Sequence, residues 1–209
     1  MYRLGYIDED EGQRNSFYQF LKDDFEITLF GITEETELDS LVEEIFQSGI
    51  DMLVLDFRLD ETGLVNFNAD SLVDKIQERN LYYPLVILTS HEEDAMDHIS
   101  NANLINGKEE MLGSKVQLFK QKLNKIVNGY QTRVSEAETE LEELENKRQN
   151  DGLDAKEEDR YVELNNYLDK TMTAKSRISR TFYSEDTNKK LDDLIEKTSE
   201  ILSKIEKEK

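Results

Sequence analysis

The sequence contains no cysteine, which excludes disulfide bonds, thiol chemistry and cysteine-based zinc sites. With only two histidines beside this absence, there is little reason to propose zinc at all. No apolar run approaches the roughly 20 residues that a membrane-spanning helix needs. The N-terminal stretch MYRLGYIDED also lacks the apolar core of a signal peptide. We therefore expect a cytoplasmic protein that does not cross a membrane.

Basic residues are scarce: 26 Lys and Arg stand against 47 Asp and Glu, which gives a net charge of -21. This balance argues against binding to nucleic-acid backbones or anionic membranes, because both require basic surfaces. The imbalance is strongest in residues 1–127, which hold 26 acids and 11 bases, whereas residues 128–209 hold 21 and 15. The acids of the first part are therefore the more informative ones.

Over roughly its first 115 residues, the chain alternates short apolar runs with helical patterns. This order is typical of a parallel sheet with crossover helices. The candidate strands are 2–8, 25–31, 51–56, 84–90 and 102–107. Because such crossovers are right-handed, we predict an α/β fold in which five parallel strands form a doubly wound sheet between helices.

From about Ser114 onward, apolar residues recur in alternating steps of four and three. The first such heptad seam consists of Leu123, Val127, Tyr130, Val134, Ala137, Leu141 and Leu144. The second consists of Tyr161, Leu164, Leu168, Thr171, Lys175, Ile178 and Phe182, and the third of Leu191, Leu194, Thr198, Ile201 and Ile205. Heptads of this kind favour helix-on-helix packing of the coiled-coil type.

Turn residues at 150–154 separate the first two seams, and Asp154 with Glu157 has the spacing of a capping box. We therefore predict an α/β domain over 1–125, followed over 126–209 by an antiparallel coiled-coil hairpin and a further helix. The first hairpin helix is expected to be continuous with the last helix of the α/β domain. Heptads permit self-association as readily as an intramolecular bundle, so the sequence leaves open whether the protein forms a homo-oligomer.

Chemically active side chains stand where the predicted strands end, and these ends meet at one edge of a parallel sheet. They are Asp8 and Glu9 after the first strand, Asp56 at the third, Thr89 at the fourth and Lys108 at the fifth. Crowded carboxylates repel one another unless a cation lies among them, and hard oxygen ligands suit Mg²⁺. With that ion bound, Asp56 could attack a phosphoryl group. Lys108 would pair with the resulting phosphate, and the Thr89 hydroxyl would donate a hydrogen bond to it.

At these residues the chain resembles the receiver (CheY-like) domain of response regulators in two-component phosphorelays, over residues 1 to about 125. The resemblance is carried by YIDEDEGQR, LVLDFRLDETG, VILTS and INGK, in that order. It implies a flavodoxin-like receiver sheet and phosphorylation of Asp56, with a histidine kinase or phosphotransfer protein as donor. It also implies Mg²⁺ held by Asp56, by Glu9 directly, by Asp8 through water and by the carbonyl of Arg58.

The chain departs from the receiver pattern at several positions. Asp60 and Glu109 stand where the family usually has proline, and the segment LVNFN (64–68) is inserted before the third helix. Ile105 occupies the position of the aromatic residue whose rotation normally accompanies phosphorylation. No basic reading helix is visible, so we expect output by contact with a downstream protein through the helical hairpin rather than through DNA.

Two other functions stay open. A receiver-like domain that is no longer phosphorylated could serve as a scaffold, and the missing aromatic and prolines favour this alternative. YIDEDEG also resembles the opening of haloacid-dehalogenase-type phosphatases, with Asp8 as nucleophile and Asp10 as acid/base, but Asp56 would then have no role. Because Asp10 also stands where a helix begins, it could simply cap that helix. The leading interpretation is a phosphoacceptor rather than an enzyme.

Overall fold

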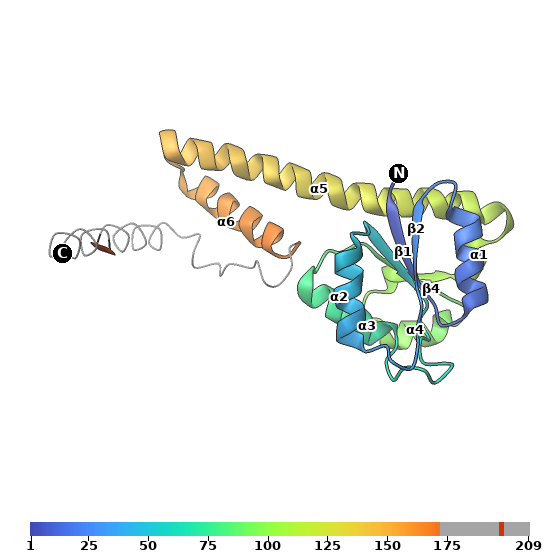
Figure 1. Ribbon diagram of the computed structural model, residues 1–209. Coiled ribbons are helices and arrows are strands. Elements are labelled where there is room, and N and C mark those ends of the chain that lie inside the picture. Colours follow the sequence, from blue (N-terminus) through green and yellow to red (C-terminus); the bar gives the residue numbers. More distant parts are fainter. Residues whose placement is uncertain (172–196, 199–209) are drawn as a thin grey trace, which may run out of the picture. The chain divides into compact units, whose positions relative to one another are not determined.

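The computed structural model describes residues 1–171 and 197–198 (Figure 1). The chain divides into two compact units, Met1–Arg133 and a second unit that begins at Val134. Apart from two positions, the segment 172–209 lies outside the described residues. Most of the third heptad seam lies there, as do Lys175, Ile178 and Phe182 of the second. Among the helices that can be described, none has both the length and the apolar character required to cross a bilayer.

The first unit contains one sheet of five parallel strands, which confirms the predicted fold class. The strands are β1 (Arg3–Ile7), β2 (Glu26–Phe30), β3 (Met52–Leu55), β4 (Leu85–Thr89) and β5 (Ile105–Gly107). Their order in the sheet is β2-β1-β3-β4-β5, the order of flavodoxin-like doubly wound folds. The last strand is shorter than predicted, because Ala102–Leu104 form a 3₁₀ turn before it.

Helices cover both faces of this sheet, and Figure 1 shows α1 and α2 on opposite sides of the strands. The helices of the first unit are α1 (Glu11–Leu21), α2 (Leu38–Ser48), α3 (Ala69–Arg79), α4 (Glu92–His98) and the N-terminal part of α5 (Val116–Asn150). One core joins α1 and α5 to one sheet face, through residues such as Phe17, Val54 and Phe119. The other joins α2, α3 and α4 to the opposite face, around Leu53 and Leu55. Since both faces are buried, the central strands are continuous apolar runs rather than alternating ones.

The inserted segment 64–68 packs on the domain rather than projecting from it. Phe67 is buried in the core beneath α2, α3 and α4, and Leu64 and Val65 pack against the same core. The turn that leads into the segment closes with a hydrogen bond of 2.8 Å from the Gly63 N–H to the Asp60 carbonyl. Gly63 has φ of 72°, a left-handed conformation that glycine adopts without steric cost.

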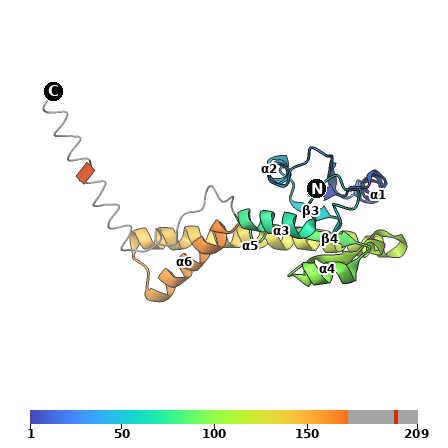
Figure 2. The same cartoon turned by 90° about the horizontal axis from the view of Figure 1, so that it is seen from below.

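The second unit contains the C-terminal part of α5 and α6 (Ala155–Asp169). Asp154 and Glu157 form the predicted capping box, in which each side chain accepts a hydrogen bond from the other residue's backbone N–H. Figures 1 and 2 show α6 running back along α5. Ala137, Leu164 and Leu168 form the buried contact between these two helices. The two packed helices of the predicted hairpin are therefore present over the described residues, whereas the predicted further helix lies outside them.

The first heptad seam does not serve a single interface. Leu123 and Val127 are fully buried in the core of the α/β unit. Val134, Leu141 and Leu144, further along the same helix, pack in the α5–α6 core. Between these two groups, the Tyr130 hydroxyl accepts a hydrogen bond of 2.9 Å from the Asn80 side chain. A regular spacing along α5 thus supplies two separate cores.

We expect Leu53→Ala to lower the free energy of unfolding by about 2–5 kcal/mol, because it opens a cavity in the middle of the sheet. Leu53 is fully buried between neighbouring strands β1 and β4. Leu118→Ala is the matched control: Leu118 is 69% exposed, and its loss should change stability by no more than about 0.5 kcal/mol. Urea unfolding followed by circular dichroism measures both, and equal effects would contradict the assigned core.

Candidate functional site

The strand register places Asp8 and Asp56 side by side. β1 and β3 are neighbours in the sheet, and Ile7 is the register partner of Leu55. Asp8 and Asp56 each follow directly after this pair, at the carboxyl edge. A hydrogen bond of 2.8 Å from the Asp56 N–H to the Ile7 carbonyl extends the ladder to this point. Two carboxylates are thus brought together by parallel pairing alone.

The Lys108 ammonium lies between these two carboxylates. Its Nζ is 3.0 Å from Asp8 Oδ2 and 2.9 Å from Asp56 Oδ1. Lys108 follows β5, which is separated from β3 by β4, so its long side chain reaches past one strand to make the contact. Burial alone would lower the pKa of Lys108, but the hydrogen bonds and charges of Asp56 and Asp8 outweigh burial and raise it. The lysine is therefore held in its charged form.

Asp8 is fully buried, and both of its carboxylate oxygens accept hydrogen bonds. Oδ1 accepts from the Asp10 N–H at 2.9 Å, whereas Oδ2 accepts from the Tyr6 hydroxyl at 2.6 Å in addition to Lys108. The Arg14 guanidinium donates to the Asp8 backbone carbonyl. Sequence reasoning did not single out Tyr6. The available signal was an aromatic residue two positions before an acid on one strand, which puts both on the same sheet face.

Asp56 is 4% exposed, and burial raises its pKa above the ordinary carboxyl value although Lys108 opposes the shift. Its Oδ1 contacts Lys108, and its Oδ2 accepts a hydrogen bond of 3.0 Å from the Arg58 N–H. The Arg58 side chain points elsewhere and forms a salt bridge of 2.8 Å with Asp94. We call the carboxyl edge of the sheet around Asp8, Glu9 and Asp56 the acidic edge. Arg58 contributes its backbone, not its side chain, to this edge.

Glu9 differs from Asp8 and Asp56 because its Oε2 atom is buried and has no hydrogen-bond partner. Desolvation, with the nearby charges of Asp8 and Asp56, raises the pKa of Glu9 to about 7. A buried oxygen without a donor is costly unless a proton or a cation satisfies it. This atom is the clearest feature of the edge that suits an added cation.

The donor set at this edge fits a hard divalent ion such as Mg²⁺, which takes carboxylate and carbonyl oxygens and keeps several waters. Of the four predicted ligands, Glu9, Asp56 and the Arg58 carbonyl would hold it directly and Asp8 through water. Among the described residues, no three acidic or histidine side chains are already gathered in metal-binding geometry. Lys108 instead bridges two of the carboxylates, so the arrangement is that of a cluster neutralised by its own lysine.

Thr89 ends β4 and is fully buried. Its Oγ1 accepts a hydrogen bond of 3.0 Å from the His91 N–H, which ties the hydroxyl to the loop that leads into α4. Ile105 is partly buried and packs against the core beneath α2, α3 and α4. The Thr89 hydroxyl and the Asp56–Lys108 pair thus lie at the ends of nearby strands, and no hydrogen bond joins them.

Asp10 serves as the N-cap of α1, because its side chain accepts a hydrogen bond of 3.0 Å from the Gln13 N–H. This capping role was the alternative that the sequence left open for Asp10. The carboxylate is thereby directed to the helix end. The arrangement gives no support to the phosphatase alternative, in which Asp10 would act as acid/base beside a nucleophilic Asp8.

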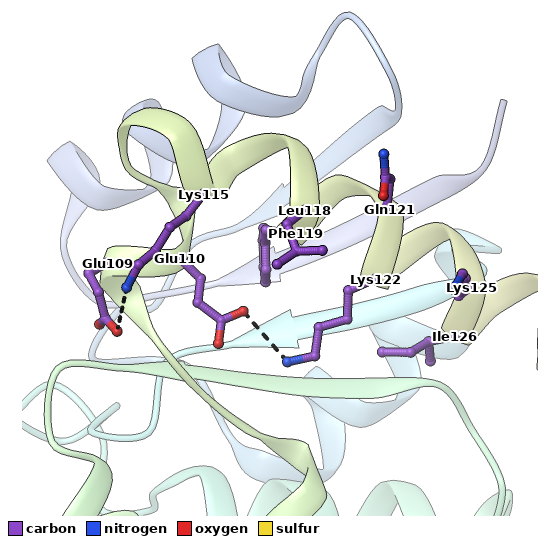
Figure 3. Close-up of a pocket in the computed structure, with 9 residues that line it drawn as sticks. All are labelled: Glu109, Glu110, Lys115, Leu118, Phe119, Gln121, Lys122, Lys125 and Ile126. Atoms are coloured by element: carbon purple, nitrogen blue, oxygen red, sulfur yellow. Dashed lines mark ion pairs between the residues drawn. The ribbon is translucent and has the colours of Figure 1, made fainter.

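A groove of about 610 Å³ lies beside α5 (Figure 3). Its lining includes Glu109, the residue that follows Lys108. Lys115 pairs with Glu109 at 3.6 Å and Lys122 with Glu110 at 3.5 Å along its border. Leu118, which is 69% exposed, contributes to its apolar lining. Asp8, Glu9 and Asp56 do not line this groove, so it is separate from the acidic edge.

The raised pKa of Glu9 predicts a pH-dependent contribution to stability in the metal-free protein. The folded-state pKa of about 7 lies above the ordinary value of 4.5. The folded protein therefore holds this proton more tightly than the unfolded chain. The resulting stability is fully present below about pH 4.5 and is lost as the pH rises through about 7.

We therefore expect the free energy of unfolding of wild type to fall relative to that of Glu9→Gln between these two pH values. Urea unfolding in the presence of a chelator, at a series of pH values, measures the difference. Glu11→Gln, at an exposed acid two residues further along, is the matched control. Parallel pH profiles for Glu9→Gln and wild type would contradict the prediction.

Comparison with known proteins finds structural similarity at low sequence identity. No protein-family model matches the sequence, and no curated protein matches it significantly. One similar solved structure is the apo receiver domain of nitrogen regulatory protein C, with 16% identity and a TM-score of 0.47, covering 62% of this chain and 97% of that one. A second, described as an adenylate cyclase from Rhodopirellula baltica, has 15% identity and a TM-score of 0.47, covering 63% and 93%. A third is a fusion that carries a trimeric coiled coil of yeast Spc42, with 18% identity and a TM-score of 0.43, covering 69% and 95%. The sheet order of the chain itself, β2-β1-β3-β4-β5, establishes a flavodoxin-like doubly wound fold for the first unit.

Proposed function

We propose that the protein is a phosphorelay signalling protein that accepts a phosphoryl group on Asp56 in a Mg²⁺-dependent reaction. The observation that carries the proposal is the Lys108 ammonium, 2.9 Å from Asp56 and 3.0 Å from Asp8, beside the unpartnered oxygen of Glu9. This combination provides a nucleophile, a cation for the transferred phosphate and a place for a divalent ion. The donor would be a phosphohistidine on a kinase or a phosphotransfer protein, in the cytoplasm.

The chemistry follows from the partners of Asp56. An ionised Asp56 attacks the phosphorus of the phosphohistidine, the P–N bond breaks, and an aspartyl phosphate forms while histidine is released. The bound Mg²⁺ would neutralise the charge of nucleophile and phosphate together. The Arg58 N–H, which donates to Asp56 Oδ2 at 3.0 Å, keeps the carboxylate oriented. Lys108, already in contact with Asp56 Oδ1, would turn to the new phosphate and hold its charge.

The helical hairpin is proposed as the output element that contacts a downstream protein. α5 runs without interruption from Val116 to Asn150, so the helix that covers the receiver-like sheet also supplies the hairpin. This continuity supports a route by which a change at Asp56 could alter a distant contact. The predicted domain boundary at residue 125 falls inside α5, before the first compact unit ends at Arg133.

A phosphorylation-independent scaffold is the second candidate. It is favoured by Ile105 at the position of the switch aromatic and by Asp60 and Glu109 at positions where the family usually has proline. A scaffold would use the same fold and hairpin to bind partners. The two candidates differ in one measurable property, covalent phosphorylation of Asp56.

Incubation with Mg²⁺ and a small phosphodonor such as acetyl phosphate should add one phosphoryl group to the wild-type chain. Intact-mass spectrometry measures the product. We expect Asp56→Asn to abolish the added mass, because the amide lacks the nucleophilic oxygen, and chelation of Mg²⁺ to do the same. Asp60→Asn, at an exposed acid in the same loop, is the control that should remain phosphorylated. Wild type that stays unmodified would favour the scaffold.

Binding of beryllofluoride, a phosphoryl mimic, should change amide hydrogen exchange within residues 116–150 if α5 carries the signal. The physical reason is that α5 and the sheet share one core, through Phe119, Leu123 and Val127. Mass spectrometry of amide hydrogen exchange measures the change. The Asp56→Asn variant, treated in the same way, is the control. Unaltered exchange across α5 in a chain that demonstrably binds the mimic would contradict this output route.

A further inference from the structure

We propose that Tyr6 is a positioning residue that keeps Asp8 out of direct coordination to the cation and so favours Mg²⁺ over Ca²⁺. The inference rests on the proposed function, because it concerns the cation at the same acidic edge. It adds a residue outside the set of acids, hydroxyl and lysine discussed so far. It also assigns different tasks to Asp8 and Glu9.

The position of Tyr6 forces its hydroxyl toward Asp8. Side chains two residues apart on a strand share a sheet face, and both Tyr6 and Asp8 are fully buried. The Tyr6 ring stacks on Phe17 of α1, with ring centres 3.9 Å apart and planes inclined by 5°. Phe17 therefore packs on one face of the Tyr6 ring and restricts its orientation. A buried tyrosine hydroxyl needs an acceptor, and Asp8 Oδ2 provides it at 2.6 Å.

Asp8 has more hydrogen-bond donors than Glu9: three groups donate to its carboxylate, which offers about four acceptor positions. Asp8 Oδ1 is held by the Asp10 N–H, and Oδ2 is held by Tyr6 and Lys108. Of these donors, Lys108 alone has a flexible side chain that can move to a phosphate. Glu9 Oε2, in contrast, has no partner. A cation that arrived at this edge would meet an available oxygen on Glu9 and an occupied carboxylate on Asp8.

This difference affects the two common divalent ions unequally. Mg²⁺ requires six ligands in strict octahedral geometry, keeps several of its waters and needs only one or two carboxylates. Ca²⁺ takes six to eight oxygen ligands in flexible geometry, so it gains more from an additional carboxylate. With Asp8 retained by Tyr6, the edge offers few direct ligands, which suits Mg²⁺. Release of Asp8 would add the ligand that benefits Ca²⁺.

The test is calorimetric titration of the metal-free full-length protein with MgCl₂ and, separately, with CaCl₂. Tyr6→Phe preserves the ring that stacks on Phe17 and removes the hydroxyl alone. We expect it to tighten Ca²⁺ binding by about tenfold, the scale of one hydrogen bond to a charged group. Mg²⁺ binding should change by less than about threefold, so that the ratio of the two dissociation constants moves toward Ca²⁺.

Tyr83→Phe is the matched control, because Tyr83 is a partly buried tyrosine whose hydroxyl donates to the Ile50 carbonyl at 2.9 Å, away from Asp8. It should leave both affinities unchanged. An unchanged ratio in Tyr6→Phe, or equal weakening of both ions, would overturn the role of Tyr6 while leaving the proposed function in place. A wild-type protein that binds neither ion would remove the cation from the proposed function, and this inference with it.

A second measurement needs no substitution. The Tyr6 hydroxyl proton, in a short buried bond to a carboxylate, should give a downfield proton resonance in the wild-type NMR spectrum, and Tyr6→Phe assigns it. We expect this resonance to persist when the protein is saturated with Mg²⁺, because Asp8 stays bonded to Tyr6. Its loss on Mg²⁺ saturation would show that Asp8 leaves Tyr6 for the metal, and would overturn the inference.

Discussion

The acidic edge depends on one ammonium group that two buried carboxylates share. Asp8 and Asp56 both lie against Lys108, at 3.0 and 2.9 Å. Without that counter-charge, two ionised carboxylates at this depth would repel each other and would be costly to bury. The contact in turn depends on parallel register, which places the two acids after the same residue pair and brings β5 close enough for a lysine to reach them. Fold and electrostatics are therefore inseparable at this edge.

Three acids of similar intrinsic chemistry acquire different properties from their hydrogen-bond partners. Asp8 accepts hydrogen bonds from Tyr6, Lys108 and a backbone N–H. Asp56 accepts from one side chain and one backbone N–H, and burial raises its pKa. Glu9 keeps an oxygen with no partner. Neighbouring carboxylates at the same sheet edge therefore differ in how many of their oxygens have hydrogen-bond donors.

The long helix α5 contributes to two cores. In α5, Leu123 and Val127 belong to the sheet-side core, whereas Val134 and Leu141 belong to the contact with α6. On the other side of the sheet, Ile105 packs against the core beneath α2, α3 and α4, and the Thr89 hydroxyl accepts a hydrogen bond from the loop before α4.

Local pattern alone determined the five strands, the helices between them, the capping box of Asp154 and the identity of the acids and lysine at the strand ends. These features depend on apolar periodicity and on side chains near in sequence, which are visible in the chain itself. Long-range packing decided the rest. Heptad spacing could not reveal that one seam divides between two cores, and residue type could not reveal that Thr89 bonds to His91 or that Tyr6 bonds to Asp8. Such bonds depend on rotamers and neighbours fixed by tertiary contacts, because a buried polar group takes whichever partner the folded chain brings within reach.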